Sequence, residues 1–313
     1  MKISIQSGCS VNEFGVAKAY EMYREAGFEA IDWNIDMALD RKALMAGTYL
    51  GKSIFESSLE DILAYYEEEL CEMKKNGLTV TQAHAPFPAY VTDKPEVLDY
   101  MIGIYHKCIA LCDHLQIKNL IIHGISLAKD DTVNTVADIE ALNRKLYTSL
   151  IPALQKANGV TVCLENLLTQ YENIKHQKMW FTGHCSDAQA ASAFIDELNE
   201  MAGKECFGLC FDTGHLQLLK QDMRVYLPVL GKRIKALHIH DNDGADDLHM
   251  APYTGTIVWK DFYTTLAEIG YTGDLSFETF RQTTVNNIDA EMVSPWLKLI
   301  ASCGEFFRSK IQK

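Results

Sequence analysis

The feature that most constrains the fold is a regular alternation of short β-type runs with longer helical stretches along the whole chain. Strands separated by helices favour parallel pairing, because a parallel partner is reached only through a crossover connection. Runs with the composition of strands lie at 3–6, 29–35, 78–84, 118–124, 159–166, 206–212, 233–241 and 273–279. Eight such units in 313 residues predict an α/β fold, a single (β/α)8 TIM barrel with parallel strands.

Helical spacing fills the segments between the predicted strands. In 58–75, apolar residues recur at three- and four-residue steps, which predicts one helix. Pro95 should open the next helix, since proline is favoured in a first turn. Helices are expected to end near Gly27, Gly77, Gly159 and Gly270. Larger loops are expected at 36–56, 166–186 and 241–258.

Composition restricts the partners. The formal net charge is −13, with 29 basic against 42 acidic side chains, which argues against a nucleic-acid partner because phosphate binding needs Lys and Arg. The chain shows no signal peptide and no apolar run of membrane-spanning length, and its nine cysteines are scattered without a CxxC pair. We therefore expect a cytoplasmic protein with free thiols and no membrane partner. Because no linker or low-complexity tract divides the chain, one domain is expected over 1–313.

Ligand-type side chains gather where the predicted strands end, which is where barrels of this class carry their functional residues. The third to eighth strands carry His84, His123, Glu165, Asp212, His238 and Glu278 at or near their ends. Close by in sequence are His215, His240, Asp241, Asp247 and His249. One such residue taken alone is better explained as a helix cap or a histidine bound to a backbone carbonyl. So many carboxylates on one rim would repel one another without a cation, and this mixed ligand set suits Mn²⁺, Mg²⁺, Co²⁺, Fe²⁺ or Zn²⁺.

Several short motifs occur in a fixed order from the third strand to the eighth. They are QAHAPF at 82–87, LIIHG at 120–124, VCLEN at 162–166, FDTGH at 211–215, HIHDND at 238–243, DLHMAPYTG at 247–255 and SFET at 276–279. With these motifs the chain resembles the xylose isomerase-like barrel superfamily. That superfamily holds sugar isomerases and epimerases, inosose dehydratases and endonuclease IV-type DNA repair enzymes.

The resemblance implies a divalent metal bound by four residues: Glu165, Asp212, His238 and Glu278. His238 is preferred to His240 because the metal histidine of the family is followed three residues later by an acid, in the form H-x-x-D-N. The implied function is a sugar or keto-sugar isomerase or epimerase. Its metal would stabilise an enediolate, while Glu165 and Glu278 act as acid and base on the two faces of one carbon.

Further residues are assigned to a small-molecule sugar substrate. The resemblance places His215 on a substrate oxygen, and His84, His123, Trp180 and Arg281 are further candidates for substrate binding. Trp180 and Phe181 also suggest a lid or pocket wall, and Arg281 could hold a carboxylate or phosphate. In one respect the chain departs from the ketohexose 3-epimerases, which carry an arginine six residues after the metal histidine, where Gly244 stands here. Their particular substrate is therefore not implied.

Two other enzymes and a binding protein stay open as alternatives. An endonuclease IV-like phosphodiesterase acting at apurinic sites would hold a trinuclear metal cluster, with His84, His123, His215, Asp247 and His249 as additional metal ligands. The acidic charge and the loop after Glu165 weigh against it. A keto-sugar or inosose lyase would use the same metal site, and a binding module would not need two carboxylates on one ion. A homo-oligomer is also left open.

Overall fold

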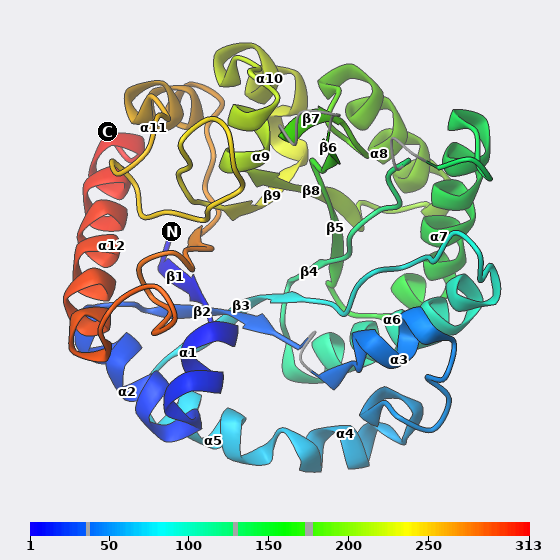
Figure 1. The fold of residues 1–313 in the computed structure, drawn as a ribbon, viewed down its shortest axis with the longest axis horizontal. Coiled ribbons are helices and arrows are strands. Elements are labelled where there is room, and N and C mark those ends of the chain that lie inside the picture. Colours follow the sequence, from blue (N-terminus) through cyan, green and yellow to red (C-terminus); the bar gives the residue numbers. More distant parts are fainter. Residues whose placement is uncertain (36–37, 128–130, 173–177) are drawn as a thin grey trace. The chain divides into compact units, whose positions relative to one another are not determined.

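The computed structural model describes residues 1–35, 38–127, 131–172 and 178–313. Its main sheet has eight strands: β1 (Ile3–Gln6), β2 (Ala30–Asn34), β3 (Thr79–His84), β4 (Asn119–Ile121), β5 (Thr161–Glu165), β8 (Phe207–Asp212), β9 (Ile234–His238) and β10 (Leu275–Phe277). Their order in the sheet is β10-β1-β2-β3-β4-β5-β8-β9. A parallel bridge from Ile239 to Phe277 joins the two ends of this order. The predicted fold class, an α/β (β/α)8 TIM barrel, is confirmed (Figure 1).

Helices follow the strands. They are α1 (Gly8–Phe14), α2 (Val16–Ala26), α3 (Arg41–Ala46), α4 (Leu59–Tyr65), α5 (Glu67–Lys75), α6 (Glu96–Leu115), α7 (Val136–Lys156), α8 (Ala188–Ala202), α9 (Thr213–Leu218), α10 (Met223–Leu230), α11 (Trp259–Glu268) and α12 (Ala290–Ile311). Short 3-10 helices occur at Ile54–Glu56 and Gly231–Arg233. Within the described residues, none of the helices has the length and apolar character needed to span a membrane.

The chain divides into two compact units. Unit 1 contains Met1–Trp33, Glu68–Thr81 and Cys210–Lys313, and unit 2 contains Asn34–Glu67 and Gln82–Leu209. The expectation of one domain over 1–313 stays a prediction.

In unit 1, β1 lies between β10 and β2, and Ser4 is paired with Ser276 on one side and with Ala30 on the other. One face of β1 and β10 packs on α12, which lies beside α2 and α11 (Figure 1). Gly304 makes this contact close, because a Cβ added there would lie 2.7 Å from Ile3 and 2.9 Å from Phe277. Since side chains alternate along a strand, Ser4 and Ser276 face away from α12.

In unit 2, β3, β4 and β5 are parallel neighbours, with His84 paired to Ile121 and Ile121 paired to Cys163. The helices α6, α7 and α8 lie side by side (Figure 1). A capping box starts α7, in which Thr135 accepts from the backbone of Asp138 and the Asp138 carboxylate accepts from Thr135. Asp187 caps α8 by accepting from the backbone of Ala190.

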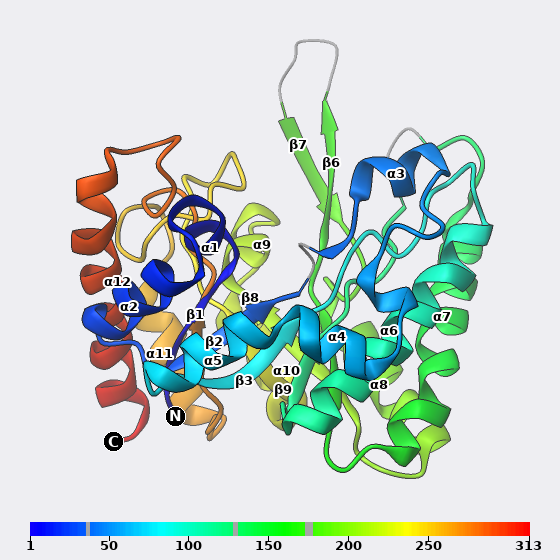
Figure 2. The ribbon, with the colours of Figure 1, turned by 90° about the horizontal axis from the view of Figure 1, so that it is seen from below.

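Three predictions of local structure were wrong. The loop expected at 36–56 contains the helix α3 and the 3-10 helix Ile54–Glu56. The loop expected at 166–186 contains an antiparallel hairpin of β6 (Leu168–Glu172) and β7 (Lys178–Thr182), which extends beyond α7 and α8 (Figure 2). The aromatic and β-branched residues of this hairpin favour strands. Because each run is short, the sequence pattern predicted a loop. The single helix expected over 58–75 is two helices, because Tyr66 leaves the helical conformation and its hydroxyl donates to the carbonyl of Ile35 at 3.3 Å.

Candidate functional site

The predicted site residues stand at or just beyond the carboxyl ends of strands. His84, Glu165, Asp212 and His238 are the last residues of β3, β5, β8 and β9, and Glu278 directly follows β10. His123 comes two residues after β4. Parallel barrel strands place these ends on the functional rim. The side chains of Glu165, Asp212, His238 and Glu278 are all buried, so their charges must be balanced locally.

Unit 2 brings together three of these residues. The Nε2 atoms of His84 and His123 are 3.0 Å apart, and His123 Nε2 is 3.0 Å from Glu165 Oε2. His84 donates its Nδ1 proton to the carbonyl of Ala85 at 2.9 Å, so the lone pair of its neutral ring lies on Nε2. Two ring nitrogens and a carboxylate oxygen therefore converge, with either a proton or a cation between them. The three residues offer their ligand atoms within 4.8 Å of one another, which fits a divalent metal.

Aromatic and cationic side chains border this group of three. The Phe87 ring lies 4.6 Å from the His123 ring and 5.5 Å from the His84 ring, measured between centroids. On Phe87 rests the guanidinium of Arg41, 3.7 Å from the ring centroid. This stacking fixes the orientation of the two imidazoles and keeps one side of the group apolar.

Unit 1 contains a longer arrangement, in which carboxylates and imidazoles alternate. We call it the alternating cluster. Its members, in order of contact, are Asp32, His238, Glu278, His249, Asp247, His215, Asp212 and His240. Successive members approach within 2.9–3.6 Å between a ring nitrogen and a carboxylate oxygen. The structure thus places the predicted residues Asp212, His215, His238, Asp247, His249 and Glu278 in one group.

Asp212 has two roles in this cluster. Its Oδ1 accepts from the backbone N–H of His215 at 2.6 Å, which caps α9. Its two carboxylate oxygens also lie 3.0 and 2.9 Å from Nε2 of His240. Helix capping and a site role are therefore combined in one residue. The close fit depends on Gly214, since a Cβ there would lie 1.9 Å from Cε1 of His240.

Asp247 and His249 shift each other's pKa. Burial works to raise the pKa of the Asp247 carboxyl, but hydrogen bonds from His215 and His249 outweigh it and hold this pKa well below its usual range. Burial likewise works to lower the pKa of His249, yet its hydrogen bond with Asp247 and the charge of that carboxylate raise it to about 9. Without a metal ion, His249 is therefore a cation at neutral pH.

Two atoms of the alternating cluster support metal binding. Asp247 Oδ1 and His240 Nδ1 are buried and have no hydrogen-bond partner among the described residues. Buried polar atoms in this condition call for an ion or a water molecule. His240, Asp247 and His249 also offer ligand atoms within 4.8 Å of one another. The donor set of unit 1 therefore fits a divalent cation, as that of unit 2 does.

The acid after His240 has a structural role. Asp241 Oδ1 accepts from the backbone of Asn242 and Ile257, both at 3.0 Å, and its Oδ2 accepts from Gly255 and from the indole of Trp259 at 3.1 and 2.9 Å. Both carboxylate oxygens of Asp241 therefore accept hydrogen bonds from the chain that follows β9. Asp241 anchors this loop, so the acid in the H-x-x-D spacing has a structural role here.

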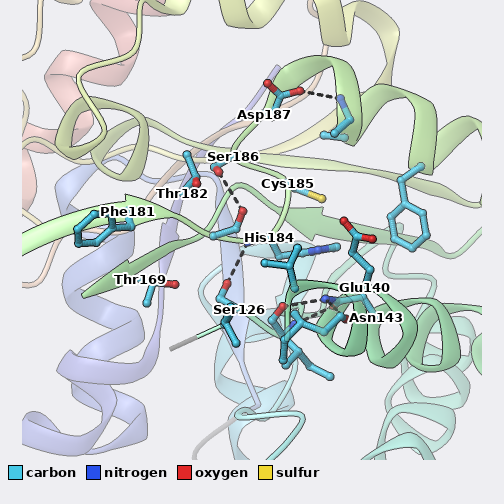
Figure 3. Close-up of a pocket in the computed structure, with 18 of the residues that line it drawn as sticks. Ser126, Glu140, Asn143, Thr169, Phe181, Thr182, His184, Cys185, Ser186 and Asp187 are labelled. Carbon is cyan, nitrogen blue, oxygen red and sulfur yellow. Dashed lines mark hydrogen bonds between the residues drawn. The ribbon is translucent and has the colours of Figure 1, made fainter. Parts of the chain in front are cut away.

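The hairpin residues border a separate cavity of about 800 Å³ in unit 2. Its walls come from the start of α7, the start of α8 and the residues around Phe181 (Figure 3). Phe181 thus lines a pocket, as the sequence suggested, but this pocket contains none of the predicted metal ligands among its described lining residues. Trp180 is partly exposed on β7, opposite Gln170. Arg281 is exposed after β10 and its backbone donates to His249. The substrate roles of Trp180 and Arg281 stay predictions.

The site also contains a residue that the sequence analysis missed. Asp32 lies on β2, fully buried, with its Oδ2 3.2 Å from Nε2 of His238. The signal was a carboxylate in the middle of the apolar run EAIDWNI. A buried strand does not place a charge at its centre without a partner.

Fold and site together define a (β/α)8-barrel protein with a candidate metal centre. The chain belongs to the xylose isomerase-like TIM barrel family, which matches residues 21–300. It is 26% identical over 280 residues to the uncharacterised protein y4fM of Sinorhizobium fredii, covering 85% of this chain and 81% of that protein. It is also 26% identical over 144 residues to a ketose 3-epimerase of Arthrobacter globiformis, covering 46% and 43%.

Solved structures show the same fold. D-allulose 3-epimerase from Methylomonas sp., in complex with D-allulose, superposes with a TM-score of 0.66 and 14% identity. The superposition covers 99% of this chain and 97% of that one. The resemblance to the xylose isomerase-like superfamily is thereby confirmed.

Proposed function

We propose that this protein is a divalent-metal-dependent isomerase or epimerase of sugars or keto-sugars. The observation that carries the proposal is the alternating cluster, in which four carboxylates and four histidines meet at the strand ends of a xylose isomerase-like barrel. The ketose 3-epimerase and D-allulose 3-epimerase to which the chain is similar support a sugar substrate.

We assign the metal in unit 1 to Asp212, His238 and Glu278. Glu165, the fourth ligand predicted from the sequence, stays a prediction. A bound divalent ion would act as a Lewis acid on a substrate carbonyl and its neighbouring hydroxyl. Which metal fills the site is part of the proposal, and the mixed oxygen and nitrogen donors suit Mn²⁺, Mg²⁺, Co²⁺ or Zn²⁺.

Glu278 is assigned as an acid and base in the reaction. The residue is 7% exposed, and its Oε2 lies 3.3 Å from His238 Nδ1 and 3.6 Å from His249 Nδ1. A carboxylate fixed in this way can take a proton from a carbon next to a carbonyl and return it. Glu165, at the end of β5 and in contact with His123, was predicted from the sequence for the same task on the other face of the carbon, and that role stays a prediction. His215 and His249 are positioned by Asp247 and could contact substrate oxygens.

The test is proton exchange during turnover. The Mn²⁺-loaded protein is incubated in deuterated water with D-allulose, other ketoses and 3-keto-glucosides, and the products are identified by NMR. We expect a new sugar isomer that carries deuterium at the carbon next to the carbonyl. Conversion without deuterium uptake would argue for a hydride shift, and elimination of water would assign the lyase alternative. No conversion of any sugar would contradict the proposal.

A phosphodiesterase with a trinuclear cluster is the second candidate, and one observation favours it. Apart from Asp212, His238 and Glu278, the described residues provide two more groups: His84 with His123 and Glu165, and His215 with Asp247 and His249. The net charge of −13 opposes it, since DNA binding needs basic contacts. About three ions per chain, together with cleavage of an oligonucleotide with an abasic site, would replace our proposal with this one.

A further inference from the structure

A buried carboxylate on β2 contacts the imidazole at the end of β9. Asp32 and His238 are both fully buried, and Oδ2 of Asp32 lies 3.2 Å from Nε2 of His238. We propose that Asp32 is a positioning residue that orients the His238 ring, so that His238 meets the metal through Nδ1. This inference rests on the proposed function, because it concerns the metal site assigned there.

The strand register explains how Asp32 reaches His238. Asp32 is paired with Gln6 across β1 and β2, so it shares the face of Gln6, Ser4 and Ser276, which is turned away from α12. Two strands, β1 and β10, separate β2 from β9. On this face they carry the small side chains of Ser4 and Ser276, which leave room for the carboxylate. Ser276 Oγ also donates to Asp32 Oδ2 at 3.4 Å.

Hydrogen-bond chemistry then selects the ligand atom. Oδ2 of Asp32 faces Nε2 of His238 at 3.2 Å, and a carboxylate beside a ring nitrogen favours a proton over a lone pair on that nitrogen, so we infer that Nε2 carries the proton. The lone pair of the neutral ring is left on Nδ1. That atom lies 3.3 Å from Oε2 of Glu278, itself a proposed ligand. A histidine whose second nitrogen donates to a carboxylate is the usual support for a metal-bound imidazole, since it fixes the ring and makes its lone pair more basic.

The same argument separates His238 from His240. The Nε2 atom of His240 lies 2.9 and 3.0 Å from the two oxygens of Asp212, which is a proposed ligand rather than a supporting residue. Of these two rings, only His238 has a carboxylate contact at each nitrogen among the described residues: Asp32 at Nε2 and Glu278 at Nδ1. Asp32 is not one of the proposed ligands. The geometry therefore favours His238 as the metal histidine.

The experiment measures affinity for Mn²⁺ rather than turnover. The metal-free wild type, Asp32→Ala, Asp32→Asn and the control Glu268→Ala, an exposed carboxylate on α11, are titrated with Mn²⁺ against a competing chelator. We expect Asp32→Ala to weaken Mn²⁺ binding by about 10–100-fold, the usual effect of losing such a support. Asp32→Asn should lose less, because its amide oxygen can still accept from Nε2. Glu268→Ala should change little. Melting curves of the metal-free proteins check that each variant folds.

The outcomes separate this inference from the proposed function. If the wild type binds no Mn²⁺, both fall together. If the wild type binds Mn²⁺ and folded Asp32→Ala binds it equally well, the role of Asp32 falls and the proposed function stands. Binding by Asp32→Asn that is weaker than binding by Asp32→Ala would also overturn the inference, because the hydrogen bond would then not be what supports the ring.

Discussion

Histidines meet opposite surroundings in the two units. In unit 1, His249 lies between Asp247 and Glu278, and the hydrogen bond with Asp247 raises its pKa to about 9 against the effect of burial. In unit 2, His184 packs between the rings of Tyr147 and Phe194, and burial lowers its pKa to about 4. At neutral pH without metal, one imidazole is charged and the other is neutral.

The difference shows how to tell a histidine of the alternating cluster from a histidine held by ring packing. Nε2 of His184 is buried and has no hydrogen-bond partner among the described residues, while its ring makes apolar contacts. His249 donates from Nδ1 to the carbonyl of Glu278 at 3.0 Å and turns Nε2 to Asp247. Carboxylates on both sides of an imidazole stabilise a positive charge there, which a proton supplies in the metal-free protein and a metal ion can supply in its place. Aromatic rings around an imidazole only fix its packing.

The largest expected effect is that of metal removal. Dialysis against a chelator should abolish turnover, and Mn²⁺ should restore it, because the alternating cluster is proposed to act only around a cation. Mn²⁺ at about 100 times its Kd should also stabilise the protein by about 2.7 kcal/mol, measured as a rise in Tm. If metal analysis shows that the protein holds no metal and it is still fully active, the proposed role of the cluster is contradicted.

Replacing Glu278 by Gln should have the next largest effect. The amide cannot take a proton, so kcat should fall by about 10²–10⁴, as is usual when a general acid or base is lost. The matched control is Glu268→Gln on the exposed side of α11, which should leave kcat unchanged. Steady-state kinetics on the substrate found by the proton-exchange assay checks both variants. Equal activity of Glu278→Gln and the wild type would remove Glu278 from the reaction.

A matched pair of glycines tests the comparison directly. A Cβ at Gly214 would lie 1.9 Å from His240, and a Cβ at Gly124 would lie 2.2 Å from His184. Each alanine variant should cost about 1–3 kcal/mol in the free energy of unfolding, because each displaces a packed imidazole. Only Gly214→Ala should also weaken Mn²⁺ binding. If Gly124→Ala weakened Mn²⁺ binding as much, the contrast between the cluster histidines of unit 1 and His184 of unit 2 would not hold.

The smallest expected effect is on stability in acid. A lowered pKa in the folded protein means that the unfolded chain binds the His184 proton more readily. The contribution of His184 is therefore fully present above pH 6.5 and is lost as the pH falls toward about 4. It should amount to about 3 kcal/mol when the pH has fallen to about 4. We expect His184→Phe to lose less stability than the wild type between pH 8 and pH 4.5 in urea unfolding of the metal-free protein. If the variant and the wild type lost the same stability between pH 8 and pH 4.5, His184 would not be the group that titrates.

Most of the fold could be predicted from the sequence. All eight barrel strands occur within the predicted ranges, because buried parallel strands form compact apolar runs that helices separate. Helix boundaries were harder. The break at Tyr66 comes from a hydrogen bond to Ile35, and a contact of this kind leaves no periodic signal. The hairpin of β6 and β7 was missed because two short strands after a barrel strand resemble a loop.

The candidate site was predictable in its residues and less so in its contacts. These residues could be found because Asp212 and His238 end their strands, while Glu278 directly follows β10 and His215 lies just after β8. Their partners depend on which side chains meet across the sheet, as Asp32 meets His238 over two intervening strands. The sequence also could not show that Asp241 is an anchor for the loop, since its acceptors are filled by residues 14–18 positions further on.

The composition of unit 1 has a consequence for biosynthesis. The alternating cluster takes Asp32 from an early part of the chain and Glu278 from a late one, and both belong to the same compact unit. On a ribosome that adds 5–20 residues per second, Asp32 would wait on the order of tens of seconds for Glu278 to be made. Until then β1 has no β10 to pair with. The proposed metal site of Asp212, His238 and Glu278 would therefore be complete only after Glu278 has been made, so metal binding there would follow most of the synthesis of this unit.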